Sequence, residues 1–234
     1  MARHPTSRRV QRQNTEPDDV FVERVLETSV WAKENAKLLI IAATALVVIV
    51  SGFLYYRNYT VRLRSAAETQ LSTIRQAVVS GNSALAIRDL EEYMIRFGGT
   101  DAGPEAIVLL GRAYLDNNEP QKAIDLLSEP ARNLARPLGA STAFLLAGAY
   151  EAAIQEDRAV QVYLDIADRA PFDYQKHEAL DNAARIRLET GDAGGALELY
   201  DRLLLLLEDT DPLRPVIQLR RGEAAARAQG TAGS

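Results

Sequence analysis

The 234-residue chain offers few side chains that could act as catalysts or as metal ligands. Its two histidines are His4, in a polar N-terminal segment, and His177, which has no second histidine and no cysteine near it. We interpret both as surface residues, because a metal site needs several donors around one ion. The absence of cysteine excludes disulfides, thiolate metal sites and cysteine nucleophiles. We therefore expect no metal, no cofactor and no enzymatic activity.

Three arginines, Arg75, Arg112 and Arg185, are the side chains best suited to binding a partner. They occupy equivalent places in a repeated helical pattern, and apolar residues lie beside each of them. A guanidinium group binds a carboxylate through paired hydrogen bonds. An apolar strip beside it could accept an extended or helical segment. Surface charges are usually uninformative, so the alternative that these are ordinary solvated arginines stays open.

Charge is distributed unevenly along the chain. Residues 1–37 contain 7 Lys and Arg against 6 Asp and Glu, whereas residues 57–234 contain 20 against 26. An acidic soluble part argues against nucleic acid as a partner, because nucleic-acid binding needs a basic surface. Residues 1–17 are polar and patternless, so we expect a disordered basic tail that could contact anionic lipid. Residues 18–37 are expected to form a short amphipathic helix beside the membrane.

Residues 38–56 form an apolar run without a single charge, and this run predicts how the chain is attached to a membrane. A helix of this length covers about 28 Å, close to the ~30 Å hydrocarbon core of a bilayer. The rings of Trp31 on one side and of Tyr55 and Tyr56 on the other suit the headgroup layer. We expect an uncleaved transmembrane helix that begins at Leu38. The alternatives are a buried core helix and a cleaved signal peptide.

The rest of the chain, residues 57–230, repeats a pattern that predicts how the arginines are positioned. Four pairs of a small and an apolar residue recur at spacings of 37, 36 and 37 residues, and they are Ala86-Ile87, Ala123-Ile124, Ala159-Val160 and Ala196-Leu197. A fixed period in this range is typical of a solenoid of helix pairs. We therefore expect an all-α fold, with one N-terminal transmembrane helix followed by an α-solenoid of about four helix pairs. Residues 231–234 are expected to be a frayed tail.

Three further expectations concern the turns and the last helix. Pro130 should kink or stop the second helix of the second unit near Ser128. The turn of the third unit is expected at Glu156-Asp157. A last helix is expected over residues 213–228, and its inward-facing residues are expected to be Val216, Ile217 and Leu219.

The second and third units resemble the tetratricopeptide repeat. That family places a large apolar residue, Leu, a small residue, Tyr, Ala, an aromatic residue or Leu, and Pro at fixed positions of a helix pair. The second unit fits at Ile107, Leu110, Gly111, Tyr114, Ala123 and Leu127, and the third fits at Leu146, Ala147, Tyr150, Ala159, Tyr163 and Pro171. The small residues are expected where two helix backbones approach each other.

This resemblance implies a binding surface, because the first helix of each tetratricopeptide pair lines a concave groove. The register places the three arginines in this groove together with apolar and acidic residues. The resemblance implies that the groove binds other proteins. The expected groove residues are Leu71, Arg75, Val78, Val108, Arg112, Leu115, Phe144, Gly148, Glu151, Asp181, Arg185 and Leu188.

The order of the parts resembles the ancillary subunit of the bacterial Sec translocon. In that family one helix crosses the inner (cytoplasmic) membrane, the N-terminal tail is cytoplasmic, and the repeats face the periplasm. The resemblance implies a single-pass adaptor that contacts the translocon, chaperones or client polypeptides. The alternative is a structural subunit of a larger membrane complex, assembled through its transmembrane helix. The oligomeric state stays open.

Overall fold

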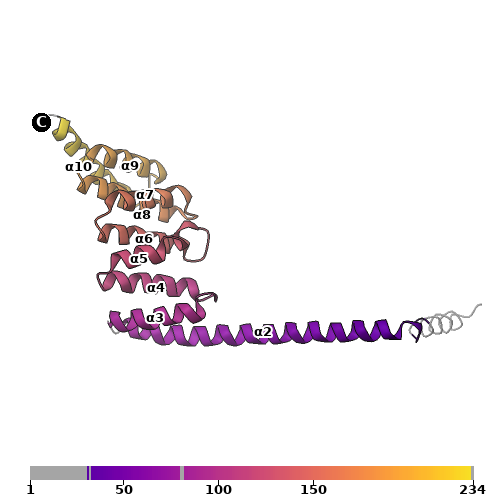
Figure 1. Ribbon diagram of the computed structural model, residues 1–234. Coiled ribbons are helices and arrows are strands. Elements are labelled where there is room, and N and C mark those ends of the chain that lie inside the picture. Colours follow the sequence, from indigo (N-terminus) through magenta and orange to yellow (C-terminus); the bar gives the residue numbers. More distant parts are fainter. Residues whose placement is uncertain (1–30, 32, 80–81, 233–234) are drawn as a thin grey trace, which may run out of the picture. The chain divides into compact units, whose positions relative to one another are not determined.

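The computed structural model describes residues 31, 33–79 and 82–232, and all regular structure within these ranges is helical. This confirms the all-α fold. The expected tail at residues 1–17 and most of the expected helix at residues 18–37 lie outside the described residues. The elements are α2 Ala36–Val79, α3 Ser83–Phe97, α4 Gly103–Asp116, α5 Pro120–Leu127, the 3-10 helix η1 Pro130–Arg132, α6 Gly139–Ala152, α7 Glu156–Arg169, α8 Asp173–Glu189, α9 Ala193–Leu206 and α10 Arg214–Ala232 (Figure 1).

The chain divides after Thr60 into two compact units, and the first of them contains the apolar part of α2. By length and composition, α2 is the single helix in the described ranges that could cross a membrane. Its apolar side chains in this unit are exposed, among them Ile41 and Phe53. The hydroxyl of Thr44 donates to the carbonyl oxygen of Ile40 at 2.8 Å. The hydroxyl is therefore satisfied within the helix, as an apolar environment requires.

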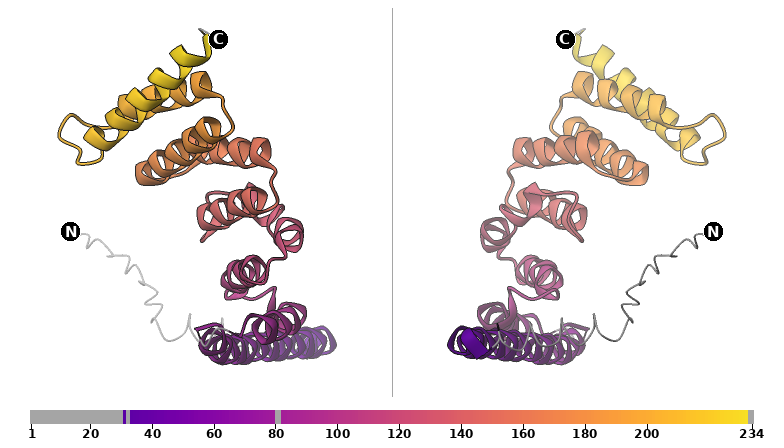
Figure 2. Two further views of the ribbon diagram at one scale, coloured as in Figure 1. Left: turned by 90° about the vertical axis from the view of Figure 1, so that its left-hand side faces the viewer. Right: turned by 90° about the vertical axis from the view of Figure 1, so that its right-hand side faces the viewer.

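In the second unit, α3 to α10 follow one another as layers of a stack (Figures 1 and 2). Helices that follow one another in the chain pack together, so α4 and α5, α6 and α7, and α8 and α9 form successive pairs. The first pair combines the part of α2 after Thr60 with α3, and α10 is the last helix. One core extends from Ala67 on α2 to Ala224 on α10. The expected solenoid of about four helix pairs is thereby confirmed.

The second pair is irregular, and its sequence explains why. α5 ends at Leu127, the next residue, Ser128, is its C-cap, and Pro130 begins η1. The end near Ser128 confirms the expectation, because the proline ring cannot continue the helix. α5 has 8 residues, whereas α7 and α9 have 14 each.

The turns inside the pairs share one backbone feature. Asn118, Ile154 and Gly191 all have a positive φ, of 58°, 55° and 88°. The left-handed conformation suits glycine and asparagine but strains a β-branched residue such as isoleucine. The third turn therefore lies at Ile154, and the expectation of a turn at Glu156-Asp157 is wrong, because Glu156 already begins α7.

Two expectations about packing also need correction. A Cβ at Gly111 would lie 2.9 Å from Cδ2 of Leu127. A leucine side chain therefore occupies the space at Gly111, and not a second backbone. On α10, Ile217 is buried as expected, but Val216 is 46% exposed and Leu219 is 76% exposed. No later helix covers that face of α10 in the described part of the chain.

Candidate protein-binding surface

The first helices of the pairs present a common surface, which we call the first-helix face. Its residues lie three or four positions apart on each helix, so they share one side of it. The apolar members are half-buried, which leaves them partly accessible to a partner. Leu71 is an exception, because it is fully buried in the core and cannot contact a partner. The half-buried apolar members are Val78, Val108, Leu115, Phe144 and Leu188.

Arg75 on this face is already engaged by a neighbouring helix. Its Nε donates to Oε1 of Glu105 on α4 at 2.6 Å, and its Nη2 donates to Oε2 at 2.7 Å. Two parallel hydrogen bonds of this kind are the strong form of an arginine–carboxylate pair. The hydrogen bonds and the charge of Glu105 raise the pKa of Arg75. Arg75 therefore fixes α2 against α4 and is not a free binding group.

Arg185 on α8 is likewise paired. Its Nη2 donates to Oε2 of Glu151 on α6 at 2.7 Å, and its Nη1 donates to Glu189 on its own helix at 3.0 Å. Glu151 also accepts a hydrogen bond of 2.7 Å from the hydroxyl of Tyr163. Burial and this hydrogen bond raise the pKa of Tyr163. The expected groove residues Glu151 and Arg185 are thus held in one network.

The next step of the stack repeats the arrangement. Arg220 on α10 pairs with Asp181 on α8. Ion pairs therefore join α2 to α4, α6 to α8 and α8 to α10 along the first-helix face. We refer to these three pairs as the first-helix ladder. The sequence reasoning placed Asp181 on this face but missed Glu105 and Arg220.

The missed residues had a detectable signal. Glu105 precedes Arg112 by seven residues, which is two helical turns on the same face of α4. Arg220 follows Arg185 by 35 residues, close to one repeat period. Extending the repeat period beyond the fourth pair would have placed Arg220 of α10 on the first-helix face.

Arg112 differs from the other two arginines. Its side chain is exposed, and it forms no ion pair with any other described residue. It lies on α4 between Val108 and Leu115, at the one step of the face, from α4 to α6, that the ladder does not bridge. An exposed guanidinium beside half-buried apolar side chains can bind a carboxylate together with an apolar group.

The expected anchor residues lie in the first unit and are described by themselves. Trp31, Leu38, Tyr55 and Tyr56 are all exposed. Exposed aromatic and apolar side chains on one helix are suited to lipid, where the amphipathic rings prefer the headgroup level.

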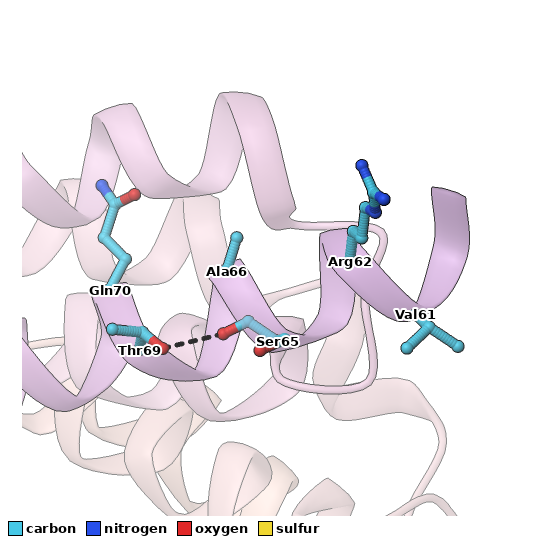
Figure 3. Close-up of a pocket in the computed structure, with 6 residues that line it drawn as sticks. All are labelled: Val61, Arg62, Ser65, Ala66, Thr69 and Gln70. Carbon is cyan, nitrogen blue, oxygen red and sulfur yellow. Dashed lines mark hydrogen bonds between the residues drawn. The ribbon is translucent and has the colours of Figure 1, made fainter. Parts of the chain in front are cut away.

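Within the described ranges, no group of three His, Asp or Glu side chains could hold a metal ion. A hollow on α2 is lined by Val61, Arg62, Ser65, Ala66, Thr69 and Gln70, and the hydroxyl of Thr69 donates to the carbonyl of Ser65 at 2.9 Å (Figure 3). All six residues belong to one helix, so no second element supplies a wall against which a ligand could be held.

Comparisons with known proteins agree with the repeat architecture. A family model described as a tetratricopeptide repeat-like domain matches residues 30–224. A crystal structure of nearly identical TPR-like repeats from Podosopora anserina, named as a kinesin light chain, is similar with a TM-score of 0.56 and 21% identity, over 71% of this chain and 89% of that chain. A variant of the same protein gives a TM-score of 0.56 and 21% identity, over 71% of this chain and 88% of that chain. At this identity the likeness shows the fold alone. No curated protein matches the chain.

Proposed function

The chain belongs to the tetratricopeptide repeat-like domain family, and we propose that it is a membrane-anchored adaptor for other proteins. Domains of this family typically bind proteins and are usually non-catalytic. In this proposal α2 holds the chain in the bacterial inner membrane, with the N-terminal tail in the cytoplasm. The repeat domain faces the periplasm, where it binds translocon, chaperone or client polypeptides during translocation or folding.

One observation supports the proposal more than any other: α2 contains both an exposed apolar stretch and part of a repeat core. Its apolar side chains before Thr60 are exposed, whereas Ala67, Leu71 and Ile74 farther along the same helix are buried. The first stretch suits lipid, and the second supplies the first helix of the stack. An adaptor that works beside a membrane needs both properties.

The first-helix face is the surface that we assign to the partner. Arg112 is a cation of this face that has no ion pair with a described residue, and Val108, Leu115 and Phe144 offer half-buried apolar contacts beside it or on the next first helix. Arg75, Glu151, Asp181 and Arg185 position the helices through the first-helix ladder. A partner segment with a carboxylate near an apolar side chain fits this set.

Cross-linking in intact membranes tests the adaptor role. The full chain and a chain without residues 57–234 are cross-linked, purified and compared for captured envelope and translocon proteins. We expect the shortened chain to lose them, and equal recovery from both chains would refute the proposal. Arg112→Ala should reduce capture, whereas Arg136→Ala is a matched control, because Arg136 is also exposed and has no ion pair with a described residue.

A structural subunit of a larger membrane complex is the second candidate, and the exposed apolar surface of α2 favours it. Replacing residues 38–56 by an unrelated transmembrane helix distinguishes the two. An adaptor should keep its partners after the exchange, whereas a subunit that assembles through α2 should lose them. A reporter fused after Ser234 measures which side of the membrane the repeats face.

A further inference from the structure

A hollow of about 500 Å³ lies between α8, α9 and α10, at the last step of the stack. Of the expected groove residues, Asp181 alone lines it, and α8 and α10 are neighbouring first helices. Its apolar lining is formed by Leu203, Leu207, Leu213, Val216 and Ile217. Leu203, Leu207 and Ile217 are buried, whereas Leu213 and Val216 stay exposed. The hollow is within the size range of ligand pockets, which is ~300–1,000 Å³.

Aromatic rings extend the apolar surface of this hollow. Tyr174 lines it and is 63% exposed, and its ring stacks on that of Phe172 at 5.8 Å between centroids. Exposed aromatic rings beside an apolar hollow are typical of sites that hold a partner, because they offer large contact area at low entropic cost.

The charges around the hollow are unbalanced. Asp181 and Arg220 neutralise each other through their ion pair. Glu178 has no ion pair with a described residue, and Asp211 accepts a hydrogen bond of 2.8 Å from the backbone N–H of Leu213. Two carboxylates therefore face the hollow without a cationic partner. Arg220 and His177 also line the hollow, and the guanidinium of Arg220 is already paired with Asp181.

The geometry points to a specific occupant: a large apolar side chain of a client polypeptide whose neighbouring residue is Lys or Arg. The apolar side chain fills the space over Leu203 and Leu207. The cation pairs with Glu178 or Asp211 and can lie on the ring of Tyr174. This inference rests on the proposed adaptor function and names one kind of segment that the repeat domain would bind. The preference is opposite in charge to that of Arg112, so the two sites would bind different parts of a client.

Binding of short labelled peptides to the full chain in phosphatidylcholine nanodiscs tests the inference. The probe is a fluorescein-labelled peptide that alternates leucine and lysine, and the two controls alternate leucine with glutamate and serine with lysine. We expect the leucine–lysine peptide to bind about tenfold or more tightly than either control, as apolar and charge contacts both contribute. Equal binding of all three, or preference for the glutamate peptide, would overturn the inference.

Substitutions locate the peptide on the chain. The variants Glu178→Lys and Val216→Ser change exposed or partly exposed side chains at the hollow and should each weaken the leucine–lysine peptide about tenfold. Leu205→Ser is the matched control, because Leu205 is an exposed leucine of α9 that does not line the hollow. Unchanged affinity in both hollow variants would place the peptide elsewhere and refute the inference. A dimer of the wild-type chain that Val216→Ser converts to a monomer would also refute it, because a second copy would then cover the hollow.

The membrane cross-linking experiment keeps this inference separate from the adaptor proposal. If Glu178→Lys still captures envelope proteins but no longer binds the peptide, both stand and the hollow serves a subset of clients. If neither Glu178→Lys nor Val216→Ser changes capture or peptide binding, the adaptor role stands and the inference fails. Loss of capture on removing residues 57–234 depends on the adaptor role alone.

Discussion

Two steps of the stack are built differently on the first-helix face. From α6 to α8, Arg185 and Glu151 form an ion pair, and the intervening helix α7 is of full length. From α4 to α6, the intervening helix α5 is short, and Arg112 stays without an ion pair to a described residue. An arginine in the same place of a repeat can therefore join two helices or stay without an ion pair to a described residue. The neighbouring helices decide which of the two it is.

Removing a core side chain at the step from α6 to α8 should have the largest effect on stability. Leu180 on α8 is fully buried, and Leu180→Ala should reduce the free energy of unfolding by about 3 kcal/mol, through lost burial and the cavity left behind. Urea denaturation of the full chain in detergent, followed by circular dichroism, measures this loss. Leu205→Ala, at a leucine that is 86% exposed, is the control and should stay within about 0.5 kcal/mol.

Two glycines, Gly111 on α4 and Gly148 on α6, have different surroundings. A Cβ at Gly111 would meet the buried Leu127, whereas one at Gly148 would meet nothing within 4 Å. Gly111→Ala should destabilise the chain by about 1–2 kcal/mol through overpacking. Gly148→Ala should stabilise it by about 0.5–1 kcal/mol, because alanine favours a helix over glycine. The same denaturation measurement applies, and a loss of stability at both positions would show that Gly148 is more confined than its surroundings indicate.

The strained turn at Ile154, between α6 and α7, should become more stable after a single substitution. Ile154 has a φ of 55° and is exposed, while Asn118 occupies the equivalent turn with a φ of 58°. Ile154→Asn should raise the free energy of unfolding by about 1 kcal/mol, because asparagine tolerates the left-handed conformation. The reverse change, Asn118→Ile, should lower it by a similar amount. Thermal unfolding of the two variants gives the comparison, and shifts of the same sign would contradict it.

The two arginines should give the smallest effects on stability. Arg185→Ala removes a partly exposed ion pair and should cost about 0.5–1 kcal/mol, less at high salt. Arg112→Ala removes no ion pair with a described residue and should change stability by less than about 0.5 kcal/mol. Denaturation at low and high salt distinguishes the two residues. A salt-dependent loss at Arg112 would indicate an intramolecular partner in the folded chain.

The helices of the stack could be predicted from the sequence because each has one buried stripe with a helical period. Pro130 also predicted correctly where α5 ends, since proline is poorly tolerated inside a helix and this effect is local. The pairing of Arg75 with Glu105 and of Arg185 with Glu151 could not be predicted, because it depends on how far each helix is rotated against the next. The repeat period gives the order of the helices and leaves this rotation open.

Leu71 and Leu219 show a related limit. A stripe of apolar residues predicts which side of a helix is buried, but the edge of the stripe depends on what covers it. Leu71 is buried within the stack, whereas Leu219 is exposed on the last helix. The four-residue tail and the groove residues as a partner site remain predictions.

The shortened helix α5 has a consequence for how the domain unfolds. In stacked repeats each unit contacts its neighbours alone, and unfolding spreads from unit to unit through these interfaces. A short helix offers the smallest interface, so cooperativity should be weakest there. Backbone amides in α6 to α9 should then exchange with solvent as one protected group, while those in α3 to α5 open separately.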